Sequence, residues 1–364
     1  MTRLTTAPRP RFADWRPVPT SPAHRLACAL AVLLIAPLLL VLQPEEATAA
    51  SRLPSCPSVK KRVGGSMSSG IDATNRRGTW NLRRAVWKDN APNRIEYPIR
   101  SDAWTRGCLI GGRVHGNLPR HWTRDQWYDG EDGGKRLGGE VFRQNLTDTA
   151  DNFLLIRGAY ASDFEDAFDP NAARWDSTTY LDHVRAKYIR DDCIENEDVP
   201  HNMVITDSLF DGCFTGIAQR PGSDGAVQNG QGPHSFTMRN SLMYIKPQPL
   251  GPNYCDASDV PRGRCAATDQ ADRWLGAHGI WKWSPQAAHK VTITNTVFRL
   301  DMASYSSCSP QVWPRGTYRN VTLVWAGKGR YRTAGDCTNV LPPGVTLTTD
   351  LAVWRKAKRA WLNN

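Results

Sequence analysis

The chain has 364 residues, of which 40% are hydrophobic and 22% charged, and these proportions exclude an intrinsically disordered protein. Its 29 glycines and 25 prolines interrupt nearly the whole middle of the chain, which predicts many short strands and turns. The formal net charge of +11 favours polyanionic partners, although a basic charge can also serve solubility alone.

The first 49 residues carry the features of an export signal. Several arginines precede an unbroken apolar run over residues 26–42, and Ala47-Thr48-Ala49 follows as a small-x-small cleavage site. We expect residues 1–49 to be a cleaved signal peptide. The alternative is an uncleaved membrane anchor, since the apolar run is at the short limit for a span. In both cases the body of the protein lies outside the cytoplasm, secreted or anchored by residues 26–42.

The cysteines predict a set of disulfides. Removal of the leader takes Cys28 with it and leaves an even number, which in an exported chain indicates disulfide bonds. The expected pairs are Cys193–Cys213, Cys255–Cys265, Cys308–Cys337 and, from the two that remain, Cys56–Cys108. A zinc site is disfavoured because the chain has no Cys-x-x-Cys pair.

Four segments of the chain superpose without gaps and predict a β-solenoid. They are residues 203–210, 236–243, 291–298 and 316–323. The fifth position of each is occupied by Asp207, Asn240, Asn295 or Asn320. Apolar residues alternate before this position, as in a strand with one buried face, and the Asp or Asn then falls at a bend that tolerates left-handed geometry. Stacked on successive turns, such side chains would form a hydrogen-bonded ladder.

The other segments complete this domain plan. Residues 50–107 are expected to be an irregular N-terminal flank or cap, and residues 108–345 the solenoid. Residues 250–274 look like one long insertion, pinched by the Cys255–Cys265 pair. Residues 346–364 are expected to form a short capping helix that begins after Asp350 and covers the last turn.

The repeats, the bends and the stretch Asp191-Asp192-Cys193-Ile194 resemble the right-handed parallel β-helix proteins of the pectin-lyase-like superfamily. The resemblance covers roughly residues 100 to 330 and implies an all-β fold. The stretch is also similar to polygalacturonases, which implies general acid and water-activating base roles for Asp191 and Asp192. Where that family has Gly-His-Gly, this chain has Phe214-Thr215-Gly216, and a His-Gly pair, His278-Gly279, occurs one turn later.

The resemblance directs attention to a column of acids. Glu165 and Asp166 lie 26 residues before Asp191 and Asp192, and Asp211 is expected to continue the column. Neighbouring strands lie about 4.8 Å apart, and two carboxylates at that distance repel by roughly 3 kcal/mol at an effective dielectric near 20. Three kinds of relief are open: a proton on one acid, a Ca²⁺ ion held by Glu165, Asp166 and Asp191, or neutralisation by nearby Arg and Lys.

Substrate contacts are expected from basic and aromatic residues. The basic candidates for binding carboxylates or sulfates are Arg190, Arg220, Lys246 and Lys282. Trp281 and Trp283 either form a platform for sugar rings or lie in the core.

These features support two hypotheses. The first is an exported enzyme that cleaves an acidic polysaccharide, by hydrolysis with Asp191, Asp192, Asp166, Asp211 and His278 as catalytic candidates, or by lyase chemistry with a Lys or Arg base. The second is a non-catalytic surface protein that binds glycan or a cell-envelope partner, and it predicts fully paired carboxylates and no open cleft. Either protein is expected to be a monomer that binds no nucleic acid and touches a membrane only through an uncleaved leader.

Overall fold

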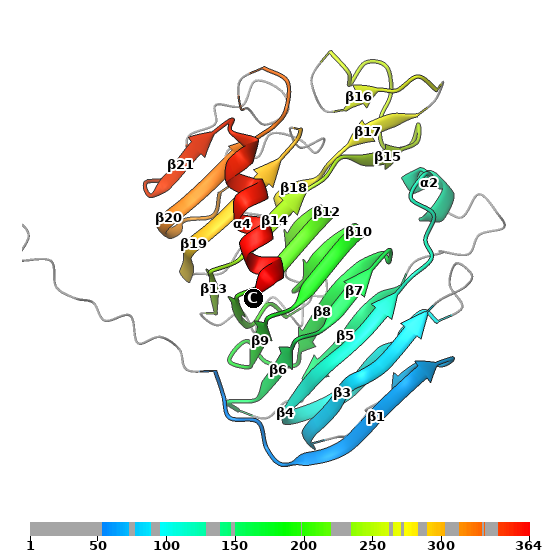
Figure 1. Ribbon diagram of the computed structural model, residues 1–364, viewed down its shortest axis with the longest axis vertical. Helices are drawn as coiled ribbons and strands as arrows, with labels where there is room; N and C mark the ends of the chain where they lie inside the picture. The colour runs from blue at the N-terminus through cyan, green and yellow to red at the C-terminus, as the bar shows by residue number, and fades with distance from the viewer. Residues whose placement is uncertain are drawn as a thin grey trace, which may run out of the picture. The chain divides into compact units, whose positions relative to one another are not determined.

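The computed structural model describes residues 53–72, 77–88, 95–128, 139–146, 150–197, 199–219, 234–261, 265–270, 273–282, 290–302, 313–329, 331 and 341–364. These residues form one compact unit, Leu53–Asn364. Strands dominate it, with a short helix, α2 (Arg124–Trp127), and a longer one, α4 (Leu351–Asn363), within the described parts (Figure 1). The protein is therefore all-β, as predicted.

Most described strands belong to one large parallel sheet. They are β1 (Val59–Met67), β2 (Ile71–Asp72), β3 (Arg77–Lys88), β4 (Ile99–His115), β5 (Glu140–Leu146), β6 (Phe153–Arg157), β7 (Tyr160–Ser162), β8 (Asp166–Ala172), β9 (Thr178–Asp182), β10 (Arg185–Glu195), β11 (Asn202–Thr206), β12 (Leu209–Ala218), β13 (Ser235–Arg239), β14 (Leu242–Ile245), β18 (Gly279–Lys282), β19 (Lys290–Leu300), β20 (Gly316–Trp325) and β21 (Val345–Thr348). Sequence order follows the stack in Figure 1 from β1 to β21. The sheet is closed and solenoid-like, and is compatible with a parallel β-helix.

The strand pairings sort into three columns. The first column contains β6, β9, β11, β13 and the first halves of β19 and β20. The second contains β7, the first halves of β10 and β12, β14, and the second halves of β19 and β20. The third contains β5, β8, the second halves of β10 and β12, and β18. The chain passes through the columns in turn, so residues far apart in sequence become neighbours.

The register confirms the predicted repeat. One row of paired residues in the first column is Ile205, Met238, Ile293 and Tyr318. One row in the second column is Phe210, Met243, Phe298 and Leu323. All of these side chains are buried in the main core. The alternation of apolar residues before the bend therefore marks the buried face of each strand.

The bend between the two rows also has the predicted form. Asp207, Asn240, Asn295 and Asn320 have left-handed backbones, with φ between 47° and 50°. The Asn295 side chain donates to Oδ1 of Asn240 at 3.2 Å, and the Asn320 side chain donates to Oδ1 of Asn295 at 2.9 Å. Asn and Asp tolerate this geometry better than other residues with a side chain, which explains why the position repeats.

The N-terminal flank is regular, which corrects the expectation of an irregular cap over residues 50–107. β1 pairs with β3, and β3 pairs with β4, all in parallel. Trp80, Leu82 and Trp87 are buried in the main core. Arg83 and Arg84 interrupt the apolar alternation because they point to solvent at a register shift in β3. The solenoid therefore begins well before residue 108.

Three of the four predicted disulfides are present. They are Cys56–Cys108, Cys193–Cys213 and Cys255–Cys265. The Cys308–Cys337 pair lies outside the described residues, as do the leader and its apolar run. Disulfide bonds are typical of extracellular proteins. Within the described part of the chain, no helix has the length and apolar character needed to cross a membrane.

The insertion after residue 247 forms a small antiparallel sheet of its own. Its strands are β15 (Gln248–Leu250), β16 (Ala266–Ala267) and β17 (Trp274–Gly276). Cys255 and Cys265 belong to a separate apolar cluster here, with Phe214 and Leu250. Figure 1 shows this sheet close to helix α2, and Asp125 of α2 accepts a hydrogen bond from the backbone of Asn253 at 3.0 Å.

Helix α4 forms at the predicted place but packs differently. Asp350 caps it by accepting a hydrogen bond from the Ala352 backbone at 2.8 Å. Trp354 then packs with Leu209, Leu242 and Val324, which come from β12, β14 and β20. The helix therefore lies along the second column instead of covering the last turn, because three strands of that column carry apolar residues on their outer side.

Candidate active site

Asp191 and Asp192 lie where β10 passes from the second column into the third. Asp192 pairs in register with Thr215 on the next turn, and Thr215 pairs with Gly279 on the turn after it. On the preceding turn, Oδ1 of Asp166 accepts a hydrogen bond from the Asp192 backbone at 2.7 Å. The predicted neighbourhood of Asp166, Asp191 and Asp192 is therefore real.

Arg124 neutralises Asp191. Its Nη2 lies 2.5 Å from Oδ2 of Asp191, and the side chains of both residues are less than one-tenth exposed. Thr123 positions Arg124 through a capping box with Gln126 at the start of α2. Burial alone would raise the pKa of Asp191, but the charges of Arg124 and Lys282 outweigh burial, so this pKa lies below its usual value.

Aromatic rings surround the Arg124 guanidinium. Its central carbon lies 4.6 Å from the ring centre of Tyr128, 5.0 Å from that of Tyr254 and 5.3 Å from that of Phe214. Ring faces attract a cation, and more strongly where water is excluded. Tyr128 follows α2 directly, Tyr254 lies in the insertion and Phe214 lies in β12, so Arg124 connects α2 to the insertion and to β12 beside Asp191.

Lys282 neutralises Asp192 only in part. Its Nζ lies 2.9 Å from Oδ2 of Asp192 and 3.6 Å from Oε1 of Glu197. Oδ1 of Asp192 is buried and has no hydrogen-bond donor among the described residues. Burial, with the charges of Asp191 and Glu197, raises the pKa of Asp192 to about 6 against the opposing effect of Lys282. A proton on Asp192 would reside at Oδ1, the oxygen that lacks a donor.

The two adjacent carboxyl groups therefore differ in their readiness to ionise. Asp191 stays ionised far into the acid range, whereas Asp192 exchanges a proton near pH 6. Paired carboxyl groups whose environments separate their pKa values are the usual means by which an enzyme sets one acid to donate a proton and another to remain charged. This is the chemistry that the arrangement can perform.

His278 lies beside this pair as a neutral group. Its Nδ1 is 3.2 Å from Oγ1 of Thr215, and its backbone N–H donates to the Phe214 carbonyl at 3.0 Å. Burial and the nearby charge of Lys282 lower the pKa of His278 to about 4, despite the opposing influence of Asp191. At neutral pH the imidazole can therefore accept or donate a hydrogen bond but carries no charge.

More acids continue along the third column. Glu140, Asp166 and Glu195 can each offer one oxygen within 4.8 Å of the others, and Asp192, Glu195 and Glu197 can do the same. Burial, with the neighbouring carboxylates, raises the pKa of Asp166 and of Glu195 well above the usual values. The acids that could hold a Ca²⁺ ion are therefore, apart from Asp166, other members of the third column than those predicted. The predicted set of Glu165, Asp166 and Asp191 is not among the described groups that meet this distance.

Asp211 does not belong to this column, which corrects the expectation that it continues the acids. It pairs in register with Lys187 and Tyr244 in the second column, and Lys358 lies 2.6 Å from its carboxylate. One turn in this region takes about 24 residues, as the pairing of Lys187 with Asp211 shows. Asp211 follows Asp191 by only 20 residues, as Cys213 follows Cys193, and this is less than one turn. Asp211 therefore does not reach the column that contains Asp191 and Asp192.

Other substrate-contact candidates have structural roles. Arg190 is buried and donates to the carbonyls of Pro119 and Trp122 at 2.9 and 2.6 Å, which holds the segment before α2. Trp281 is 6% exposed and packs edge-on against Phe236, so it is a core residue and no sugar platform. Lys246 has its Nζ 4.7 Å from the ring centre of Tyr188. Arg220 and Trp283 lie outside the described residues.

Sequence reasoning missed three groups of the site: Arg124, Glu140 and Glu197. Glu140 could have been predicted from the sequence, because it pairs with Asp166 one turn earlier in a strand with the same alternating pattern. Thr123-x-x-Gln126 is a capping-box pattern that could have located the start of α2 and so singled out Arg124. Nothing local indicated that α2 would reach Asp191, 67 residues away in the chain.

No protein-family model, curated protein or solved structure matches the chain.

Proposed function

We propose that this is an exported carbohydrate-active protein that hydrolyses an acidic polysaccharide, built on a right-handed parallel β-helix of the pectin-lyase-like type. The observation that carries the proposal is the pair of adjacent carboxyl groups with oppositely shifted pKa values, Asp191 low and Asp192 high. Three disulfides in the described residues fit an extracellular site of action.

Each acid has a distinct part in this reaction. Asp192 is the proton donor to the leaving oxygen of the glycosidic bond, since a raised pKa keeps its proton available in mildly acid solution. Asp191 remains ionised and orients water or stabilises the positive charge that develops on the sugar ring. Its pairing with Arg124 makes it a weak base, so charge stabilisation is the larger part of its role.

Elimination is less well supported than hydrolysis. A lyase needs a base that loses its proton near neutral pH, and Lys282 is the cation beside Asp192. Burial would lower the pKa of Lys282, but the charges of Asp192, Asp191 and Glu197 outweigh burial and raise it above its usual value. Lys282 therefore stays protonated and serves to neutralise charge.

A second candidate function is non-catalytic binding of a glycan, and the burial of the two acids favours it. Asp191 is 6% exposed and Asp192 is 1% exposed. Each has a cation bound to it, as the non-catalytic hypothesis expects. Two side chains this buried are poorly accessible to a sugar chain, which is why their burial favours binding over catalysis.

Release of new reducing ends from a panel of uronic-acid polymers tests the proposal. The wild-type protein is compared with Asp191→Asn, Asp192→Asn and Asp211→Asn, the last as a matched control because it is an acid paired with a lysine outside the cluster. We expect the first two substitutions to abolish release and the third to preserve it. Binding of a polymer without release by the wild type would instead establish the second candidate.

A further inference from the structure

Helix α4 carries an unusual charge distribution. The segment Leu351–Asn363 contains four cations, Arg355, Lys356, Lys358 and Arg359, and no acidic residue. Arg355 and Arg359 are four residues apart, and like charges at this spacing weaken a helix. Helix stability therefore does not explain the pattern.

One side of α4 is committed to the protein. Trp354 is buried, and Nε1 of Trp361 donates to the Asp207 carbonyl at 2.8 Å. Lys358 lies 2.6 Å from the Asp211 carboxylate. These contacts fix the helix on the second column and use most of its apolar side chains.

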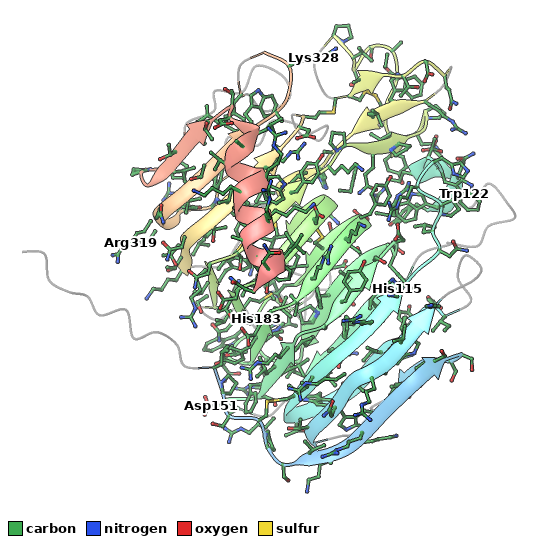
Figure 2. The ribbon with its side chains drawn as sticks, in the orientation of Figure 1. His115, Trp122, Asp151, His183, Arg319 and Lys328 are labelled. Carbon is green, nitrogen blue, oxygen red and sulfur yellow. A yellow bond between two sulfur atoms is a disulfide. The ribbon has the colours of Figure 1, made fainter. Side chains whose placement is uncertain are left out.

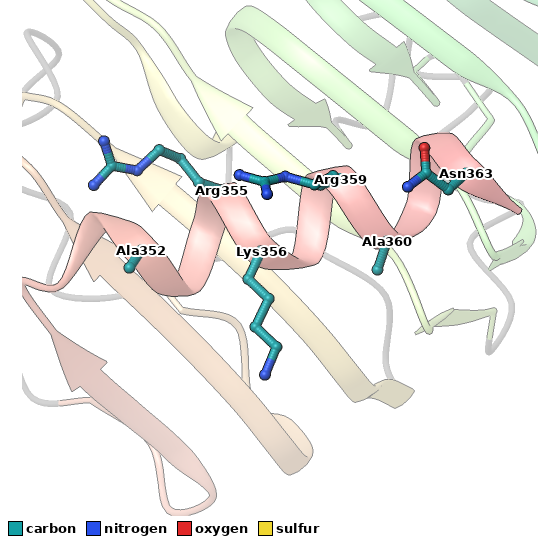
Figure 3. A pocket seen from close by; sticks show the side chains of 6 residues that line it. All are labelled: Ala352, Arg355, Lys356, Arg359, Ala360 and Asn363. Atoms are coloured by element: carbon teal, nitrogen blue, oxygen red, sulfur yellow. The ribbon is translucent and has the colours of Figure 1, made fainter.

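The other side is basic and open. Arg355, Lys356 and Arg359 are exposed, and no described acidic residue forms an ion pair with any of them. A hollow of about 400 Å³ lies along this side. Figure 3 shows Arg355, Arg359 and Asn363 in one row along the helix, and Ala352, Lys356 and Ala360 in the other. The small side chains of Ala352 and Ala360 leave room beside the cations.

We propose that this face of α4, defined by Arg355, Lys356 and Arg359, is a binding surface for a linear acidic polysaccharide, separate from the acid cluster. Successive cations in one row lie about 6 Å apart along the helix axis, so a chain running along the hollow meets repeated positive charge. Arg guanidinium groups suit carboxylate and sulfate groups because they can donate two parallel hydrogen bonds. The inference stands whether or not Asp191 and Asp192 are catalytic.

A polysaccharide fits this face better than a lipid surface does. Helices that lie in a membrane interface insert a broad stripe of apolar and aromatic side chains below their cations. The corresponding stripe of α4 contains Trp354 and Trp361, and it packs against the protein. The hollow contributes alanines and an asparagine between the charges, which cannot anchor a helix in lipid.

The test measures binding of polygalacturonate to the full-length protein at several salt concentrations. The triple variant Arg355→Ala, Lys356→Ala and Arg359→Ala is expected to bind roughly tenfold more weakly, with a smaller dependence on salt, because several exposed ion pairs are lost. The chain offers a matched control of equal charge: Arg62, Arg83 and Arg84 line a different hollow, and their replacement by Ala should leave binding within about twofold.

Two single substitutions sharpen the comparison. Arg359→Ala removes a cation that has no acidic partner among the described residues, whereas Lys358→Ala removes its neighbour, which Asp211 already neutralises. Arg359→Ala should weaken binding and Lys358→Ala should not. Thermal unfolding of each variant checks that the fold is retained.

Several outcomes would overturn the proposal. One is equal weakening by the two triple variants, which would reduce the effect to net charge. Another is equal binding of fully methyl-esterified polygalacturonate, which lacks the carboxylates. A third is that the protein binds phosphatidylserine vesicles and not polygalacturonate, and that the α4 triple variant no longer binds the vesicles. Loss of the binding proposal would not change the release of reducing ends, so the binding and hydrolysis proposals are tested by separate measurements.

Discussion

Replacement of Lys282 by Met probes the energetics of the acid cluster. The Lys282 side chain is 17% exposed and lies 2.9 Å from the Asp192 carboxylate, whose side chain is 1% exposed. Loss of one partner of a buried ion pair costs about 3–5 kcal/mol, because a buried charge is left without compensation. We expect Lys282→Met to lower the free energy of unfolding by about that amount at pH 8.

The loss should depend on pH in a definite direction. Burial already raises the pKa of Asp192 in the folded protein to about 6, and loss of Lys282 raises it further. A carboxyl group whose folded pKa exceeds its unfolded pKa binds more protons when folded, so stability falls as pH rises between the two values, by about 1.4 kcal/mol per pH unit. The variant should therefore be closer to the wild type at pH 5 than at pH 8.

Urea denaturation followed by tryptophan fluorescence measures these differences at both pH values. The comparison includes Asp192→Asn and the double variant Lys282→Met with Asp192→Asn, in which position 192 carries no charge. We expect the double variant to recover more than half of the loss caused by Lys282→Met alone. A loss below about 1 kcal/mol at pH 8, or the same loss at pH 5, would show that Lys282 does not compensate a buried charge on Asp192.

Three further predictions concern the fold. His201 is fully buried, and burial lowers its pKa to about 3, so the unfolded chain takes up a proton at this histidine first as pH falls. The free energy of unfolding should therefore fall by about 3 kcal/mol between pH 6.5 and pH 4. His201→Asn should remove most of this decrease, as measured by urea denaturation across that pH range. Cys193→Ser with Cys213→Ser should lower the free energy of unfolding by about 3 kcal/mol, as the 20-residue separation implies, and an unchanged melting temperature would contradict this. Asn295 has a φ of 48°, so Asn295→Ala should be about 1 kcal/mol less stable than Asn295→Gly in the same assay.

The sequence predicted the columns of the fold because their signals are local and repeated. Each copy carries its own bend residue, and Asn240, Asn295 and Asn320 each adopt the same left-handed backbone geometry. The bend aligns the strands of successive turns in the same register. The flank at residues 77–88 was misread because Arg83 and Arg84 face solvent at a register shift and so break the alternation.

The site was predictable only in the part that the solenoid fixes. Asp166 and Asp192 come together because they lie one turn apart in the same column. The placement of Asp211 failed, because Asp211 follows Asp191 by only 20 residues, whereas the pairing of Lys187 with Asp211 shows that a turn here takes 24. The contact of Arg124 with Asp191 depends on how α2 and the insertion pack, and such tertiary contacts leave no periodic trace in the sequence.

The separation of the two aspartate pKa values is tested most directly by an NMR titration of the carboxyl groups, with ¹³C-labelled aspartate and with Asp191→Asn and Asp192→Asn used to assign the two signals. We expect the Asp192 signal to shift with a midpoint near pH 6, and the Asp191 signal to keep the shift of an ionised carboxylate down to the lowest pH at which the protein stays folded. Two signals that titrate together near pH 4, as solvated aspartates do, would contradict it.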